Sequence, residues 1–192
     1  ENYEEEILKQ CQTAVCLGIT AMTGNQIKDG LRIAGIVKKK FPKLPIVWGG
    51  WHVSLLPSQA LENPSVDIAI KGPGELAFTE LVKALEKNKS LEGIQGISYK
   101  KNGKIRHNPD RLFPDVSEFP EMPFYLVDFS KCFYSSEFGQ KTTNYITSYG
   151  CPYRCGFCCE SSVNKSRWKG FSAKRVVDEL EQLERLGADS VS

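Results

Sequence analysis

Three cysteines stand close together in the stretch SYGCPYRCGFCCES, residues 148–161. Cys151, Cys155 and Cys158 have the spacing C-x3-C-x2-C, and Cys159 follows directly. Thiolates are preferred ligands of zinc and of iron–sulfur clusters, and a run spaced this closely can converge on one metal centre. The spacing therefore predicts a metal site in a loop that follows a strand.

The number of ligands separates two kinds of metal site. A structural zinc site closes with four protein ligands, whereas a 4Fe-4S cluster held by three leaves one iron open for chemistry. The alternatives are a zinc site completed by Cys159 or His107, or thiols without metal. Because the Cys159 side chain should point away from that of its neighbour, we assign the metal to Cys151, Cys155 and Cys158.

Composition narrows the class of protein. The 192 residues are 41% hydrophobic, enough for a real core, and the net charge of +2 offers no broad field for nucleic acid. No apolar run approaches the roughly 20 residues of a membrane-spanning helix. The chain has seven cysteines, which are odd in number and unevenly spread along the sequence. This pattern indicates a protein of the reducing cytoplasm rather than a disulfide scaffold.

Strands and helices alternate through the first half of the chain, which predicts a doubly wound parallel (Rossmann-like) α/β sheet. The expected strands cover 14–19, 45–50 and 66–72, and the expected helices cover 3–11, 25–40 and 74–87. Residues 96–107 read as a hairpin closed at Asn102-Gly103, a pair suited to a type I′ turn. One face of the expected helix over 25–40 carries the apolar residues Ile27, Leu31, Ala34 and Val37. The buried face of the expected helix over 74–87 carries Phe78, Leu81, Val82 and Leu85.

Four prolines between residues 108 and 123 forbid a long helix and predict an extended connector. Beyond it, 143–148 reads as a strand that enters the cysteine loop. Ser172 is expected to cap a helix with a buried stripe of Val176, Leu180, Leu183 and Leu186, followed by a strand over 187–192. We predict an incomplete α/β domain at 1–107, a linker at 108–141 and the start of a β/α barrel at 142–192. A whole barrel takes about 250 residues, so we expect this one to be cut short.

The cysteine loop resembles the signature of the radical S-adenosylmethionine (radical SAM) enzymes, and Phe157 and RWKGFSAKRVVDEL are similar to that family too. The resemblance implies that Cys151, Cys155 and Cys158 hold a 4Fe-4S cluster, whose free iron is chelated by SAM. Reductive cleavage would then produce a 5′-deoxyadenosyl radical. Phe157 would lie near the adenine, although a plain packing role fits almost as well.

Ligands of doubly wound sheets collect outside the carboxyl ends of the strands. Those ends read TAMTGN at 20–25, GGWH at 49–52 and KGPGE at 71–75. Each carries glycine, which either lets a ligand approach the backbone or simply forms a tight turn. Three in succession favour a broad ligand platform, and none matches G-x-G-x-x-G or a phosphate loop.

The first domain resembles the cobalamin-binding domain of one large branch of radical SAM enzymes, on stretches such as VWGGWHVSLLPSQAL and VDIAIKGPGELAFTELVKAL. The resemblance implies cobalamin contacts at the three strand ends: Thr20, Met22, Thr23, Gly24, Gly49, Gly50, Trp51, His52, Gly72, Gly74 and Glu75. His52 lacks the D-x-H-x-x-G motif of cobalt-ligating histidines, since Gly50 and Leu55 stand where its aspartate and glycine would be. We therefore expect His52 to hydrogen-bond near the cofactor or to order the turn.

These features predict a cobalamin-dependent radical SAM enzyme that transfers methyl groups to an unactivated carbon of a small molecule. The resemblance also implies an external electron donor such as flavodoxin or ferredoxin. Some members of the branch cyclise or rearrange substrates instead. Two further hypotheses are a radical SAM enzyme without cobalamin, similar to methylthiotransferases, and a non-catalytic metal-binding module.

Overall fold

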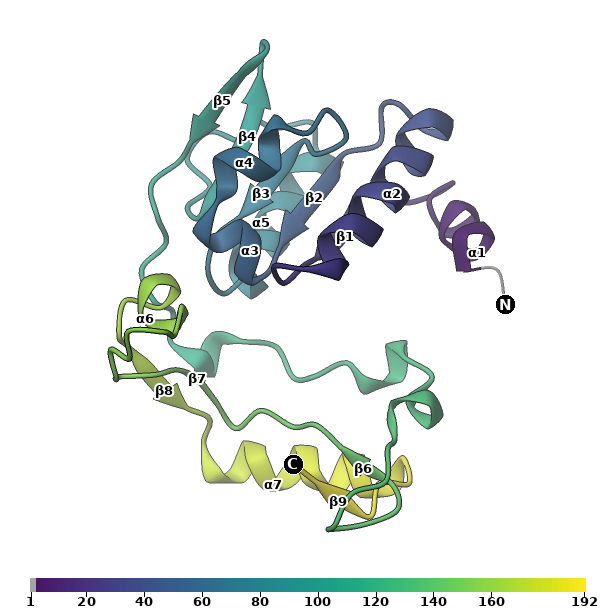
Figure 1. Cartoon of the computed structure of the whole chain (residues 1–192), viewed down its shortest axis with the longest axis vertical. Helices are drawn as coiled ribbons and strands as arrows, with labels where there is room; N and C mark the ends of the chain where they lie inside the picture. Colours follow the sequence, from purple (N-terminus) through teal and green to yellow (C-terminus); the bar gives the residue numbers. More distant parts are fainter. Residues whose placement is uncertain (1–2) are drawn as a thin grey trace. The chain divides into compact units, whose positions relative to one another are not determined.

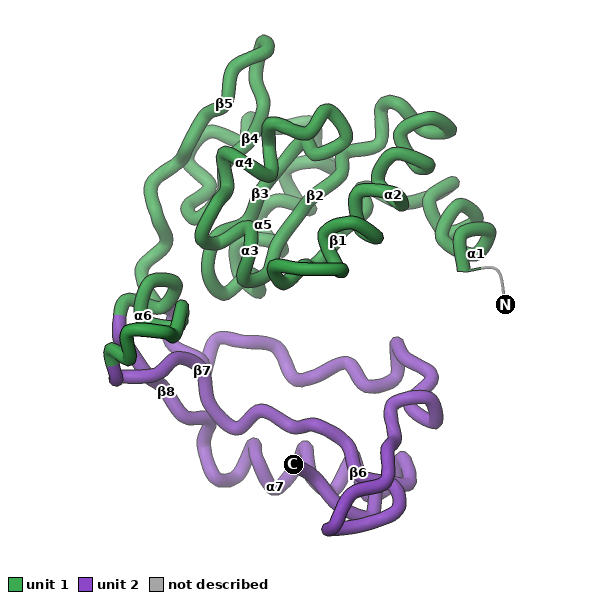
Figure 2. Tube along the Cα trace, viewed as in Figure 1, with its two compact units in different colours: residues 1–113, 154–165 green, residues 114–153, 166–192 purple. Residues whose placement is uncertain are grey.

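The computed structural model describes residues 3–192 (Figure 1). They divide into two compact units (Figure 2). Unit 1 comprises the described residues up to Phe113 together with Arg154–Lys165, and unit 2 comprises Pro114–Tyr153 and Ser166–Ser192. The predicted domain boundaries stay predictions. Within the described part of the chain, no helix has the length and apolar character needed to cross a membrane.

A five-stranded sheet forms the centre of unit 1, with the strands side by side in sequence order. Strands β1 (Leu17–Thr20), β2 (Ile46–Gly49) and β3 (Ile68–Ile70) are parallel. Strands β4 (Ile97–Lys101) and β5 (Lys104–His107) add an antiparallel hairpin. The α/β prediction is confirmed, and so is the hairpin turn, where φ is 53° at Asn102 and 70° at Gly103. The first strand begins at Leu17, three residues later than predicted.

Helices cover both faces of this sheet, as the doubly wound prediction requires. Helices α2 (Asn25–Lys40), α3 (Trp51–Leu55) and α4 (Pro57–Glu62) contribute to one core cluster. Helix α5 (Glu75–Glu86) contributes to the other, and α1 (Tyr3–Gln10) packs at the margin of the first. Because β1, β2 and β3 are parallel, their carboxyl ends lie at the same edge of the sheet.

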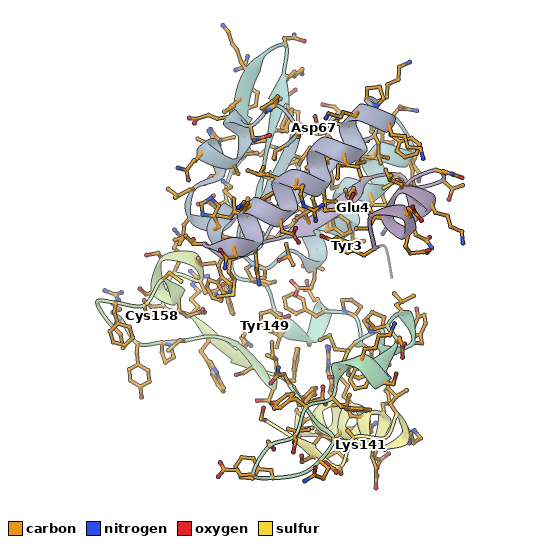
Figure 3. The ribbon with its side chains drawn as sticks, turned by 45° about the vertical axis from the view of Figure 1, so that its right-hand side comes forward. Tyr3, Glu4, Asp67, Lys141, Tyr149 and Cys158 are labelled. Atoms are coloured by element: carbon orange, nitrogen blue, oxygen red, sulfur yellow. The ribbon has the colours of Figure 1, made fainter. Side chains whose placement is uncertain are left out.

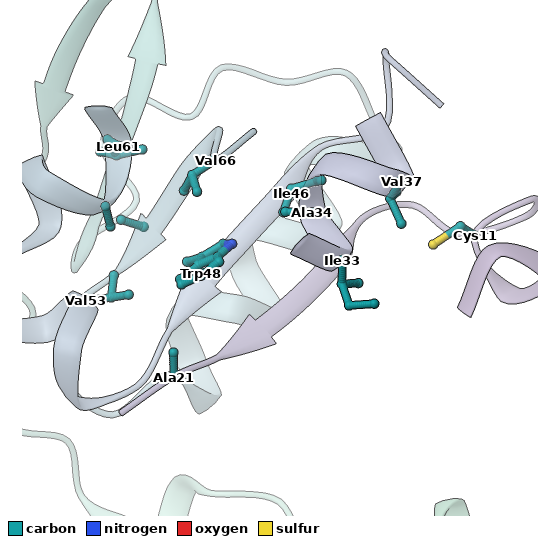
Figure 4. Close-up of a cluster of buried hydrophobic side chains, with 12 residues drawn as sticks. Cys11, Ala21, Ile33, Ala34, Val37, Ile46, Trp48, Val53, Leu61 and Val66 are labelled. Atoms are coloured by element: carbon teal, nitrogen blue, oxygen red, sulfur yellow. The ribbon is translucent and has the colours of Figure 1, made fainter. Parts of the chain in front are cut away.

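Trp48 lies at the centre of the first core and is only 1% exposed (Figure 4). Ala34 and Val37 of α2 are fully buried against this core, and Ile27 and Leu31 pack beside them, so the predicted face of α2 is confirmed. Gly30 brings α2 close to the strands: a Cβ there would stand 3.0 Å from the Trp48 ring and 3.1 Å from Ile19.

The second core lies between the sheet and α5. Leu81 is fully buried and Leu85 packs against the cluster, as predicted, with Ala77 also buried. Phe78 differs from its prediction, because it is 38% exposed at the margin of the sheet.

Unit 2 contains one β/α unit and short turns. Strand β6 (Thr142–Thr143) pairs in parallel with β9 (Ser190–Val191), and α7 (Ala173–Arg185) directly precedes β9. Strand β7 (Ser148–Gly150) pairs antiparallel with β8 (Trp168–Gly170). Three 3-10 turns, η1 (Val116–Glu118), η2 (Phe124–Leu126) and η3 (Phe129–Cys132), interrupt the segment before β6.

Two details of unit 2 differ from the sequence prediction. The strand expected over 143–148 is divided between β6 and β7, since its two ends pair with different partners. On α7, Ser172 caps the helix as predicted, accepting a hydrogen bond from the Arg175 amide at 3.2 Å. The predicted stripe is wrong at Leu186, which is 40% exposed beyond the end of the helix, while Glu179 is buried at 1% exposure.

Two glycines of α2 test this packing. Gly35 has open space around its Cβ position, so Gly35→Ala should stabilise the chain by roughly 0.5 to 1 kcal/mol through helix propensity. Gly30→Ala should destabilise it by about 1 to 3 kcal/mol, because the buried Trp48 ring cannot retreat. Urea denaturation followed by circular dichroism measures both, and equal midpoints for the two variants would contradict the packing.

Candidate functional site

The three predicted strand ends lie together at one edge of the sheet in unit 1. Because β1, β2 and β3 are parallel neighbours, their following segments are adjacent. Hydrogen bonds join the first two: the Ala21 amide donates to the Gly49 carbonyl at 3.1 Å, and the His52 amide donates to the Ala21 carbonyl at 3.2 Å. The edge is therefore one continuous surface.

The glycines on this edge differ in whether the fold requires glycine at their positions. Gly50 has φ 90°, and a Cβ there would stand 2.7 Å from Thr20 Oγ1 and 2.8 Å from the Ala21 carbonyl oxygen. Glycine is therefore required at position 50, because two chain segments cross there. Gly49 and Gly72 have no atom within 4 Å of a Cβ position, so their missing side chains leave open surface. A bulky ligand would approach the backbone at these two.

Ser54 joins the second and third strand ends, and sequence reasoning missed it. Its hydroxyl donates to the Gly50 carbonyl at 2.8 Å and accepts from the Gly72 amide at 2.9 Å. The signal was a serine inside a short helix directly after two glycines, since such hydroxyls commonly bond to nearby backbone groups. Ser54 therefore connects the turns that carry Gly50 and Gly72.

His52 is buried in unit 1. It is 7% exposed, and Nδ1 lies 3.1 Å from Thr23 Oγ1. It lines a cavity of about 410 Å³ together with Trp48 and Gln59. Of the two roles predicted for His52, the contact with Thr23 suits ordering of the turn.

The remaining predicted contacts are distributed along the same edge. Met22 is 56% exposed, and its amide donates to Gln26 Oε1 at 2.8 Å. The others stand at the starts of helices or at the end of a strand: Gly24 before α2, Trp51 at the start of α3, Gly74 and Glu75 at the start of α5, and Thr20 at the end of β1.

Sequence reasoning also missed Gly18. Gly18 and Thr20 are exposed on β1, and a Cβ on Gly18 would stand 3.6 Å from the Phe78 ring of α5. This places an open strip of backbone beside a half-exposed aromatic ring on the α5 face of the sheet. The available signal was a glycine inside a strand, which often marks a close approach by a ligand.

The cysteine loop is divided between the two units. Cys151 is half-buried after β7 in unit 2, whereas Cys155, Cys158 and Cys159 are exposed in unit 1. Figure 3 labels Cys158 on the segment that leads into α6 (Glu160–Val163), a helix that contacts α3 within unit 1. Among the described residues, no group of three or more His, Cys, Asp or Glu side chains is placed to hold a metal ion. Phe157 is 95% exposed.

The other candidate ligands have different surroundings. Burial raises the pKa of the Cys11 and Cys16 thiols, which keeps both neutral and poor as metal ligands. His107 has Ser98 Oγ at 2.8 Å from Nδ1 and Ser58 Oγ at 3.3 Å from Nε2, so both ring nitrogens are occupied. These contacts disfavour the zinc alternative in which His107 is the fourth ligand.

Asn164 follows α6 and is a further unusual group near the cysteine loop. It is 6% exposed, and its Oδ1 has no hydrogen-bond partner among residues 3–192. The next two residues, Lys165 and Ser166, have positive φ angles of 55° and 53°. Strained backbone beside an unsatisfied buried acceptor is typical of functional segments.

Comparison with known proteins places this geometry in a family context. Residues 4–82 match the B12 binding domain family. An uncharacterized methyltransferase of Pyrococcus horikoshii is 40% identical over 85% of this chain and 35% of its own length. The cobalamin-dependent radical SAM methyltransferase TokK of Streptomyces tokunonensis is 29% identical over 81% of this chain and 23% of its own. An anaerobic magnesium-protoporphyrin IX monomethyl ester cyclase of Synechocystis is 27% identical over 94% of this chain and 36% of its own.

Solved structures agree in fold. The methyltransferase TsrM of Kitasatospora setae, solved with cobalamin and a 4Fe-4S cluster, superposes with TM-score 0.74 at 21% identity over 100% of this chain and 39% of its own. OxsB, solved with aqua-cobalamin and S-adenosylmethionine, gives TM-score 0.73 at 25% identity over 95% of this chain and 25% of its own.

Residues 4–82, which carry the sheet edge, are similar to the B12 binding domain family. Over most of its length the chain is similar to cobalamin-dependent radical SAM enzymes, as the sequence resemblance predicted. It spans about a quarter of the length of these two proteins, 23% of TokK and 25% of OxsB.

Ser54 provides a test of the edge. In Ser54→Ala the Gly72 amide loses its acceptor, so its opening free energy should fall by about 1 to 2 kcal/mol, which is roughly tenfold faster hydrogen exchange. Ser58→Ala is the matched control, because Ser58 is exposed and its hydroxyl lies 3.3 Å from His107 Nε2 rather than between the strand ends. Unchanged exchange at Gly72 in Ser54→Ala would show that the hydroxyl does not hold the two turns together.

Proposed function

We propose that this chain supplies the cobalamin-binding domain and the cluster loop of a cobalamin-dependent radical SAM methyltransferase. The observation that carries the proposal is the order of two features. An edge of three joined strand ends, inside a segment that matches the B12 binding domain family, is followed by a C-x3-C-x2-C loop.

The residues at the sheet edge suit cobalamin. Gly49 and Gly72 leave space at the backbone, and the hydroxyls of Thr20 and Thr23 offer polar partners to the amide groups of a corrin. Gly18 and Phe78 continue this surface along the α5 face, where an extended tail would find both backbone and an aromatic ring. The hydrogen bonds through Ala21 and Ser54 pre-organise the edge, which lowers the entropy cost of binding.

The chemistry of the cysteine loop suits a 4Fe-4S cluster with an open iron. Cys151, Cys155 and Cys158 are free thiols outside the core, and thiolates are the usual protein ligands of such clusters. When bound, the cluster supplies the electron that cleaves S-adenosylmethionine, and cobalamin supplies the methyl group. We assign the three thiolates to hold the cluster, and Phe157 to cover the nucleoside when the loop closes.

Methyl transfer is the leading reaction, because the relative at 40% identity and TokK both carry methyltransferase names. The cyclase relatives make ring closure the main competing outcome. We further propose a small-molecule substrate and an external one-electron donor of the flavodoxin or ferredoxin type. Free cysteines throughout the described chain suit the reducing cytoplasm.

The experiment is anaerobic reconstitution of the full-length protein with iron, sulfide and hydroxocobalamin, followed by cofactor counts and an assay for 5′-deoxyadenosine. Each of the variants Cys151→Ala, Cys155→Ala and Cys158→Ala should lose nearly all cluster iron. Each should retain cobalamin, because the two cofactors use separate residues. Cys159→Ala is the matched control and should keep full iron content.

Two outcomes would contradict the proposal. Iron loss in Cys159→Ala equal to that in Cys158→Ala would overturn the three-ligand assignment. If wild-type protein retains iron but no cobalamin, the proposed methyl donor is absent. The result would then indicate a radical SAM enzyme that does not use cobalamin.

A further inference from the structure

A buried ion pair in unit 2 has no role in the function described above. Arg175 and Glu179 stand one turn apart on α7, with Arg175 Nε 2.9 Å from Glu179 Oε1. The side chains are 15% and 1% exposed, respectively. Burial of a charged pair costs desolvation free energy, so its other contacts must explain why it is there.

The guanidinium of Arg175 binds the segment that precedes the barrel. One terminal nitrogen donates to the Phe119 carbonyl at 2.9 Å, and the other donates to the Pro120 carbonyl at 2.8 Å. The planar fork of arginine suits two neighbouring acceptors, which the single ammonium group of lysine cannot reach together. Arg175 thereby fixes residues 119–120 against α7.

The carboxylate of Glu179 binds the chain after β6. Its Oε2 accepts from the Tyr145 hydroxyl at 2.7 Å. Burial, together with the hydrogen bond to Glu179, raises the pKa of Tyr145, so the hydroxyl stays protonated and remains a donor. Glu179 thus links the Arg175 fork to the segment between β6 and β7, which leads towards the cysteine loop.

Aromatic rings complete a closed circuit that includes Tyr149, the residue labelled in Figure 3. The Arg175 guanidinium lies 4.0 Å from the centre of the Phe171 ring. Phe171 meets Tyr149 edge to face at 5.9 Å, and Tyr149 meets Phe119 edge to face at 5.0 Å. Since Phe119 also gives its carbonyl to Arg175, each member of the circuit fixes the next.

Tyr149 stands two residues before Cys151, on the strand that forms one stem of the cysteine loop. In the ladder between β7 and β8, Tyr149 pairs with Lys169, and Gly150 pairs with Trp168. The Phe171 amide donates to the Thr147 carbonyl at 2.9 Å and closes the base of the stem. The circuit therefore determines where the backbone enters the loop at Cys151.

We propose that Arg175 and Glu179 are positioning residues for the iron–sulfur cluster, which set the entry of the chain at Cys151 through the rings of Phe171 and Tyr149. This inference rests on the proposed function, because it requires Cys151 to be a cluster ligand. It assigns no direct contact between the ion pair and the cluster.

The test uses full-length protein reconstituted anaerobically with iron and sulfide. In Arg175→Lys and Glu179→Gln, iron release to a chelator should accelerate by about tenfold or more, as for other groups that orient metal ligands. The electron paramagnetic resonance spectrum of the reduced cluster should also shift or broaden. Lysine should fail to rescue arginine, because it keeps the charge and loses the fork.

Two control variants separate positioning from stability. Asp178→Asn removes the exposed pair of Asp178 with Lys174 on the same helix and should leave both readouts unchanged. Leu183→Ala removes a fully buried side chain of α7 outside the circuit, so it should lower the thermal stability while the spectrum stays that of wild type. Release rates and spectra of Arg175→Lys and Glu179→Gln that match those of Leu183→Ala would overturn the proposal.

Should the charge variants fail to fold, Phe171→Leu decides the same question, since it removes the ring and keeps an apolar side chain. Faster iron release supports the circuit, and a wild-type rate overturns it. The failure of the proposed function looks different: wild-type protein would then bind no cluster, whereas failure of this inference alone leaves every variant with the wild-type spectrum.

Discussion

The crossing of the β2–α3 turn over the end of β1 is the constraint on which the edge of unit 1 depends. Gly50 passes so close to Thr20 and Ala21 that no side chain fits between them. The Ala21 and His52 amides then form hydrogen bonds across the crossing, and Ser54 extends the connection to Gly72. Without this close approach, three separate loops would replace one surface.

The crossing also explains why the glycines beside it can remain open. Gly49 and Gly72 need no neighbouring side chain to hold their turns, because backbone hydrogen bonds and the Ser54 hydroxyl hold them. Open backbone on a rigid edge can accept a large ring without reorganisation of the protein. The same logic applies in unit 2, where the Arg175 fork and the rings around Tyr149 hold the stem of a loop whose cysteines are themselves free.

Sequence reasoning could predict what depends on local periodicity and turn chemistry. Helix α2 begins at Asn25 and ends at Lys40 as predicted, and the hairpin turns at Asn102-Gly103, because apolar spacing and left-handed turn residues are local properties. The three strand ends were found for a related reason, since alternating strands and helices determine which edge they share.

The missed features depend on contacts between residues far apart in the chain. Glu179 is buried because Tyr145 and Arg175 satisfy it, and no helical pattern could place a carboxylate in that stripe. Ser54 joins the turns at Gly50 and Gly72, and the sequence alone does not show that these two turns lie within hydrogen-bonding distance of one side chain. Without a cobalt-ligating motif, the sequence left His52 assignable either to the turn or to the ligand, and its burial beside Thr23 follows only from the packing of α3.

The central claim is that one continuous edge of unit 1 binds cobalamin, and hydrogen exchange of the full-length protein with and without hydroxocobalamin tests it most directly. The account predicts that amides in 20–24, 49–54 and 72–75 become protected together on binding, while the β4–β5 hairpin tip does not change. Protection confined to another surface, or binding without protection at any of these three segments, would contradict it.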